Sequence, residues 1–303
     1  MDNLKHPRAS SAVDHRASNC PVYAPEMTEL MERCPTVPSL PAAYLRLRQV
    51  MNDPYTSSAD FARVIEEDAG LTVRVLRLVN SAMYGVGTKV DSVVQAMSIL
   101  GVEPLNNLVL ATSAVSAFDD ISADLVDMKE FWRHSLGTAV AARAIGAHCG
   151  FVNLEPLFVA GLLHDVGRLM IHIANPDGSR LSQAHAYETG CLLYDAEFDE
   201  MGYDHAQVGR YLLDEWGLPA SLTEPVGFHH NPANAGSHVT ETAIVHIADI
   251  TAHALHLGAS GEFLVPPVSE FAWGRIAADD LGNSHLLGEI AMQYQLAVRA
   301  ILQ

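Results

Sequence analysis

The chain has 303 residues, of which 49% are hydrophobic, so it is long enough to bury one large core or two linked cores. Its 36 acidic residues outnumber 18 lysines and arginines, and the formal net charge of −18 repels a phosphate backbone, which argues against long nucleic acid as a partner. No uncharged apolar run of about 18 residues predicts a membrane span, and four cysteines without C-x-x-C spacing support neither a disulfide framework nor a thiolate zinc site.

The first 35 residues are polar and lack the apolar stretch of a signal peptide. We interpret residues 1–35 as a flexible leader and expect a cytoplasmic protein. Over residues 36–126, apolar side chains recur three and four positions apart, as in LTVRVLRLVNSAMY and VVQAMSILG, which is the helical repeat. Proline and glycine breakers divide this region. It therefore predicts a first lobe of about five short helices, with no histidine.

The acidic stretch 118–127 is the expected boundary, because thirteen of the fifteen histidines follow it. We expect a second helical lobe over residues 127–258 and a C-terminal helical extension over 259–303. Single helices are predicted for 131–149, for 155–174, for the segment that Asp204 can cap, and for 240–258. The expected fold class is an all-α, two-lobe helical bundle.

A histidine and an aspartate interrupt the otherwise apolar segment 160–172. Ionisable groups on a buried helix face cost about 2 to 7 kcal/mol unless they find partners, and imidazoles with carboxylates find a strong common partner in a metal ion. The sequence therefore predicts a buried metal site. We take seven metal-competent side chains of the second lobe as candidate ligands: His134, His164, Asp165, His205, His229, His230 and Asp249.

Each candidate also has a plain structural interpretation. The His-Asp pair could be a hydrogen-bonded core pair, and His205 a surface histidine in the first turn of its helix. The His-His pair precedes Asn-Pro and could meet the last carbonyls of a helix. Glu130, one turn before the first candidate, is better explained as a solvated helix start. Five further histidines are interpreted as structural or exposed, because nothing in their spacing requires a role: His148, His172, His246, His253 and His256.

The ordered set QAMSILG, FWRHS, AGLLHDVGRL, DHAQVGRYLLDEWGLP and FHHNP resembles the HDOD proteins of bacteria, the HD-related output domain branch of the HD phosphohydrolase superfamily. The resemblance covers residues 36–256. It implies an all-helical fold and a link to bacterial signal transduction. It also implies superfamily ligands at His134, His164, Asp165 and Asp249, and the related HD-GYP branch adds counterparts of His205, His229 and His230.

Two departures weaken a claim to cyclic-di-GMP hydrolysis. Arg168 stands where the HD-GYP branch has lysine, and the Gly-Tyr-Pro signature is absent after His230. If two ions bind, Asp165 is placed to bridge them, and a pair about 3.5 to 4 Å apart can activate a shared water. Imidazole and carboxylate ligation without thiolate fits Fe, Mn, Ni or Zn. Arg168 is a second catalytic candidate, because it could clamp a phosphate or neutralise the acidic cluster.

Two function classes follow. The first is a metal-dependent phosphohydrolase acting on a nucleotide or another phosphate ester. The second is a non-catalytic regulatory output module, in which the metal is structural and the groove between the lobes binds a signalling-protein partner or a nucleotide-type small ligand. The complete ligand set favours the first class, and the missing Gly-Tyr-Pro motif favours the second.

Overall fold

Every regular element that the computed structural model describes is helical, which confirms the all-α expectation. The described residues are 23, 25–34, 37–118, 126–276 and 284–302. Helix α1 (Pro25–Arg33) precedes the first lobe, which contains α2 (Ala42–Asn52), α3 (Ser58–Glu66), α4 (Ala69–Val79), η1 (Ala82–Tyr84), α5 (Val93–Leu100) and α6 (Val102–Ser116). The rest of the chain contains α7 (Met128–His148), α8 (Glu155–Leu163), α9 (Val166–Ala174), α10 (Pro176–Thr189), α11 (Leu193–Met201), α12 (His205–Glu215), α13 (Ala220–Phe228), η2 (Pro232–Asn234), α14 (Val239–Ala254), α15 (Glu270–Ile276) and α16 (Ser284–Ile301).

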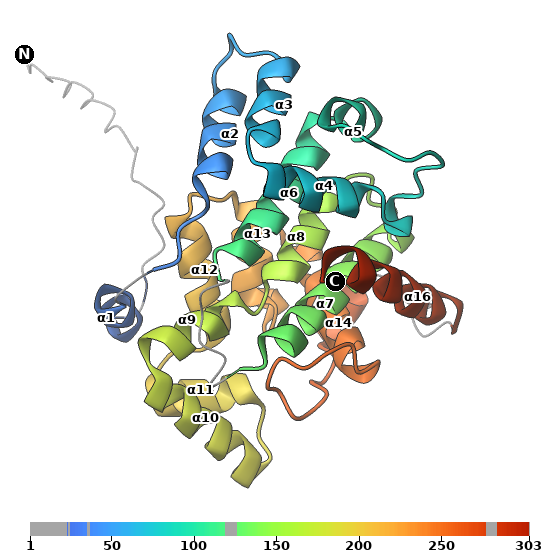
Figure 1. Ribbon diagram of the computed structural model, residues 1–303. Coiled ribbons are helices and arrows are strands. Elements are labelled where there is room, and N and C mark those ends of the chain that lie inside the picture. Colours follow the sequence, from blue (N-terminus) through green and yellow to red (C-terminus); the bar gives the residue numbers. More distant parts are fainter. Residues whose placement is uncertain (1–22, 24, 35–36, 119–125, 277–283, 303) are drawn as a thin grey trace, which may run out of the picture.

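The long helix α7 lies at the centre of the molecule and packs against α8, α14 and α16 (Figure 1). Helices α2 to α6 gather at one end, and α6 packs on α8. The α10–α11 pair lies at the other end and has a small apolar cluster of its own. One continuous apolar core otherwise runs through both lobes, so the lobes are joined by packing as well as by the chain.

Side-chain caps fix where the helices begin. Asp127 accepts hydrogen bonds from two backbone amides at the start of α7. Asp204 caps α12 as expected: its carboxylate accepts a hydrogen bond from the backbone amide of Gln207. The side-chain oxygen of Gln207 in turn accepts one from the backbone amide of Asp204, which completes a capping box. This places His205 in the first turn of α12.

The apolar segment that carries the His-Asp pair is not the single helix expected over 155–174. Helix α8 ends at Leu163 and α9 begins at Val166, because Asp165 has φ −100° and ψ 5°, outside the helical region. The whole segment Glu155–Ala174 is long and apolar enough to cross a membrane, but 83% of its most apolar stretch is buried inside the protein. That burial is consistent with the core of a soluble protein.

Two glycines let the helices around this turn approach closely. A Cβ on Gly161 of α8 would lie 2.8 Å from the Cα of Ala139 on α7. A Cβ on Gly167 of α9 would lie 1.9 Å from the carbonyl oxygen of His205 on α12. Only glycine fits such contacts, and they bring the turn between α8 and α9 against both neighbouring helices.

Part of the expected leader is ordered structure. Residues 25–33 form α1, in which Met27, Leu30 and Met31 are buried. The rest of the leader, apart from residues 23 and 34, lies outside the described residues, as do residues 119–125 of the expected boundary.

Candidate metal centre

All seven candidate ligands lie around one buried point. They come from α7 (His134), the turn between α8 and α9 (His164, Asp165), the first turn of α12 (His205), the end of α13 (His229, His230) and α14 (Asp249). Apart from the partly buried His230, none is more than 4% exposed. The side chains form two groups, each gathered around a carboxylate oxygen.

The first group surrounds Oδ1 of Asp249. This oxygen lies 3.0 Å from Nε2 of His134 and 3.4 Å from Nε2 of His164. His253, one helical turn after Asp249, brings its Nε2 to 3.4 Å from the same oxygen. A tetrahedral site with bonds of about 2.0 to 2.2 Å separates its ligand atoms by about 3.3 to 3.6 Å. The observed separations are close to that range.

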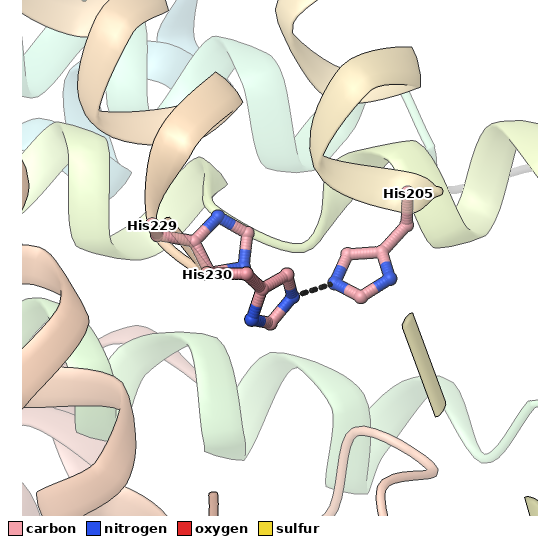
Figure 2. A group of neighbouring side chains, drawn as sticks. All are labelled: His205, His229 and His230. Carbon is pink, nitrogen blue, oxygen red and sulfur yellow. Dashed lines mark hydrogen bonds between the residues drawn. The ribbon is translucent and has the colours of Figure 1, made fainter. Parts of the chain in front are cut away.

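The second group is the histidine cluster of Figure 2, His205, His229 and His230, whose ligand atoms lie within 4.8 Å of one another. The Nε2 atoms of His205 and His230 are 2.8 Å apart. Oδ1 of Asp165 lies 3.1 Å from Nε2 of His205 and 3.8 Å from Nε2 of His229. Three imidazoles and one carboxylate oxygen therefore face a common point.

Asp165 lies between the two groups. While its Oδ1 faces the histidine cluster, its Oδ2 lies 3.5 Å from Nε2 of His164 in the first group. This is the arrangement expected of a carboxylate that bridges two ions, because each oxygen is directed to a different ligand group.

Hydrogen bonds to the outer ring nitrogens orient three imidazoles towards the centre. Nδ1 of His164 lies 2.8 Å from the carbonyl oxygen of Gly161, and Nδ1 of His229 lies 2.7 Å from that of Val226. Each Nδ1 can only donate to a carbonyl, so in the neutral ring Nε2 carries the lone pair. Both Nε2 atoms are buried and lack a hydrogen-bond partner. Unpaired inward lone pairs with oriented outer nitrogens are the donor set that a metal ion requires.

Glu197 of α11 orients the third imidazole. Its carboxylate accepts hydrogen bonds from the backbone amide and from Nδ1 of His205, and its side chain is buried. A carboxylate behind a histidine fixes the ring and increases its basicity as a ligand. No pattern in the sequence marks this role, because Glu197 lies on a different helix from His205.

The protonation of most of these groups suits a cation. Burial raises the pKa of Asp165, but Arg168 and His164 outweigh burial and hold it well below its usual range. The pKa of Asp249 is likewise lowered despite burial, chiefly by His253. Burial lowers the pKa of His229 to about 3 and that of His253 to about 4. Two other shifts run the opposite way: burial lowers the pKa of His164 and His205, but neighbouring carboxylates outweigh it, raising that of His164 through Asp165 and Asp249 and that of His205 to about 10 through Glu197 and Asp165. Ionised carboxylates and neutral imidazoles bind divalent metals, so metal binding here has to displace the protons of His164 and His205.

Arg168 is 4% exposed and is engaged within the protein. Its Nη1 donates to the carbonyl oxygen of Ser260, and its Nε lies 3.7 Å from Oδ2 of Asp165. Burial lowers its pKa, but Asp165 and Glu197 outweigh burial and raise it. In this structure the guanidinium therefore neutralises the acidic centre, while its Nη1 is held by the carbonyl of Ser260.

Two further side chains border the centre, and neither had a role that the sequence predicted. His253 joins His134 and Asp249 in a possible metal-binding group. The available signal was the spacing of four between Asp249 and His253, which places both on one helix face. Tyr194 stacks on His230 with ring centroids 4.1 Å apart, and only the structure reveals this contact.

Other residues have the structural roles expected of them. Glu130 forms a salt bridge of 2.7 Å with Arg133. Nδ1 of His246 lies 2.7 Å from the carbonyl oxygen of His229, and its Nε2 accepts the backbone amide of Ser269.

Comparison with known proteins agrees with this architecture. The family model of the HDOD domain matches residues 37–232. The chain therefore belongs to the HDOD family.

Solved structures resemble the chain over most of its length. The crystal structure of an HDOD domain protein of unknown function from Geobacter sulfurreducens is 27% identical, covers 92% of this chain and 98% of its own, and has a TM-score of 0.75. A candidate phosphohydrolase from Shewanella amazonensis is 23% identical, with coverage of 90% and 97% and a TM-score of 0.69. A second protein from that organism, named a candidate metal-dependent phosphohydrolase, is 19% identical, with coverage of 88% and 96% and a TM-score of 0.61. The two Shewanella structures support the fold alone.

Among curated proteins, one from Treponema pallidum, named only as uncharacterized, is 26% identical over 212 residues. That match includes 68% of this chain but only 40% of the length of the relative.

Proposed function

We propose that this HDOD protein is a metal-dependent phosphohydrolase of bacterial signal transduction, acting on a nucleotide or another phosphate ester. The observation that carries the proposal is the position of Asp165, with one oxygen directed to the histidine cluster and the other to His164. Ions held by the two groups would activate water and stabilise the charge on a phosphoryl group. Fe, Mn, Ni and Zn all suit the donor set.

The protein's own residues would orient and insulate this chemistry. Glu197 holds His205 in place, and backbone carbonyls hold His164 and His229. Arg168 supplies a buried positive charge beside Asp165, which would balance the carboxylates before a phosphate enters. The Gly-Tyr-Pro motif is missing, so we expect cyclic-di-GMP to be a poor substrate.

The test is a hydrolysis screen on protein purified without chelator or affinity nickel, after its metal content has been measured. Nucleotides and phosphodiesters are assayed with Mn and with Fe(II). We expect turnover that is lost in Asp165→Asn and kept in Asp177→Asn, an exposed aspartate that pairs with Arg180. Metal-loaded protein that hydrolyses no phosphate ester in a broad screen would exclude the enzymatic function.

A regulatory module is the second candidate. It is favoured by the burial of the ligands and by a groove of about 410 Å³ between the lobes, lined in part by Tyr44, Asn106, Phe151 and Leu222. Here the metal would be structural, and the groove would bind a signalling partner or a nucleotide-type ligand. The signature of this function is an Asp165→Asn protein that stays folded and keeps the partner interactions of the wild type.

A further inference from the structure

The candidate metal centre is closed in this structure. Of its ligands, His134, His164 and His205 are fully buried, and Asp165 and Asp249 are only 3% and 4% exposed. A phosphate ester must touch the ions, but among these side chains only His230 and His253 are partly exposed, and the buried carboxylates leave little surface for it. Some part of the wall has to move before substrate can enter.

Most of the elements that surround the metal centre are helices packed into the main apolar core: α7, α9, α12, α13 and α14. The part without helical structure is the segment after α14, residues Leu257–Glu262, which we name the strap. The strap crosses α7 next to a metal ligand, since a Cβ on Gly258 would lie 2.3 Å from the backbone nitrogen of His134. It then passes over Arg168, whose guanidinium lies beside Asp165.

Three polar contacts hold the strap down. The amide of Ala259 donates to the carbonyl oxygen of Glu130 over 3.1 Å. The carbonyl of Ser260 accepts from Arg168. The carboxylate of Glu262 accepts from the amide of Leu193 on α11 over 2.7 Å. These contacts are few, and they reach different helices on the two sides of the centre.

The strap also has the backbone of a moving segment. Gly258 has φ +81° and Gly261 has φ +100°, in a region that other residues rarely adopt. The two glycines flank Ala259 and Ser260, which make two of the three contacts. Rotation at Gly258 can therefore swing residues 259–262 away from the centre and break all three contacts without unfolding α14, while Gly261 lets the segment bend.

We propose that the strap is a movable cover of the metal centre, which is closed in this structure and opens at Gly258 and Gly261 to admit the phosphate ester. The proposal rests on the proposed function for the identity of what enters. Opening itself is a property of the chain, so it is measurable without any substrate.

Metal loss to a chelator reports this opening. Protein loaded with Zn²⁺ is mixed with excess chelator, and the rate of metal release is followed for the wild type and for Glu262→Ala, which removes the anchor to α11. We expect Glu262→Ala to release metal about tenfold faster, the factor that corresponds to one lost hydrogen bond of about 1.4 kcal/mol. The Zn²⁺ stoichiometry should match that of the wild type, and the free energy of unfolding should fall by no more than about the same 1.4 kcal/mol.

The control is Glu270→Ala, which removes the same charge from an exposed position on α15 and should leave the release rate unchanged. If Glu262→Ala folds poorly, Glu262→Gln serves instead, because it keeps one acceptor oxygen and should give an intermediate rate. Release at the wild-type rate would overturn the proposal, and so would equally fast release from Phe61→Leu, a core change in α3 of the first lobe, away from the strap. Absence of phosphatase activity would count against the proposed function and leave this result intact.

Discussion

The Oδ1 atom of Asp249 lies 3.0 Å from Nε2 of His134, although 115 residues separate the two along the chain. Without an ion, these buried groups satisfy each other through a proton on the imidazole. A metal that takes the Nε2 lone pair has to displace that proton. Metal binding therefore replaces a hydrogen bond that already holds α7 and α14 together.

Metal should stabilise the wild-type fold and should not stabilise Asp165→Asn. An ion that binds only the folded state at 100 times its Kd adds about 2.7 kcal/mol, which corresponds to roughly 4 °C in Tm for a chain of this size. Thermal unfolding with and without Zn²⁺ measures the difference. An equal rise in Tm for Asp165→Asn would place the ion elsewhere.

His253→Ala should weaken metal binding, because the side chain supplies an Nε2 lone pair beside Asp249. We expect a loss on the order of 10- to 100-fold in affinity, as is typical for residues that support a metal site. Competition with a fluorescent chelator gives the value. His148→Ala, at an exposed position on α7, is the control, and equal affinities for the two variants would remove His253 from the ligand set.

Glu197→Gln should also reduce metal affinity, by about 10-fold or more, because the amide no longer fixes His205 as an anionic acceptor does. The matched control is Glu200→Gln on the same helix. The carboxylate of Glu200 lies 2.8 Å from Nδ1 of His185 and does not contact the metal centre. Calorimetric titration of both variants distinguishes the roles. A Glu197→Gln protein with wild-type affinity would show that the hydrogen bond does not orient the ligand.

The free energy of unfolding should decrease as the pH is lowered from 7 to 5, in part because of His172. Burial, assisted by Arg168, lowers the pKa of His172 to about 4, whereas the unfolded chain has the ordinary value of 6.5. The unfolded state therefore binds the proton first, and the stability present above pH 6.5 is lost as the pH falls towards 4. At pH 5 the loss is about 2 kcal/mol. Urea unfolding should show a flatter pH dependence for His172→Gln than for wild type, with His148→Gln unchanged.

Gly167→Ala should destabilise the protein by about 1 to 3 kcal/mol or more. The added methyl group would lie 1.9 Å from the carbonyl oxygen of His205, so α9 and α12 must separate. Gly274→Ala on α15 is the control, since a methyl group added there would meet no neighbouring atom within 4 Å. Denaturant unfolding gives the free energy of unfolding of both variants. Similar values for the two variants would mean that α9 and α12 can separate at little cost in free energy.

The fold class and the region where the ligands converge were predictable from the sequence, because both depend on local patterns. Apolar residues at helical spacing identify α4 and α5, and the buried His-Asp pair marks where polar groups need partners. Asp204 identified the start of α12 through its cap. These signals lie within a few residues of the features that they predict.

The remaining features arise from contacts between distant segments. Glu197 and His205 meet across two helices, and the turn at Asp165 reflects the fit of α8 and α9 against their neighbours. The position of His253 near Asp249 could have been predicted, because a spacing of four residues places both on one helix face. An isolated histidine near a helix end, however, has many structural explanations. The engagement of Arg168 by Ser260 depends on a backbone carbonyl, which no sequence motif marks.

The family match ends at residue 232, whereas Asp249, His253 and the strap all follow it. The matched region supplies the whole histidine cluster and Asp165, but only part of the group around Asp249. Changes confined to α14 and the segment after it could therefore remove or restore one ion site without altering the matched domain. Chains that share the family signature need not share the group around Asp249, because Asp249 and His253 lie in the stretch that the signature does not reach.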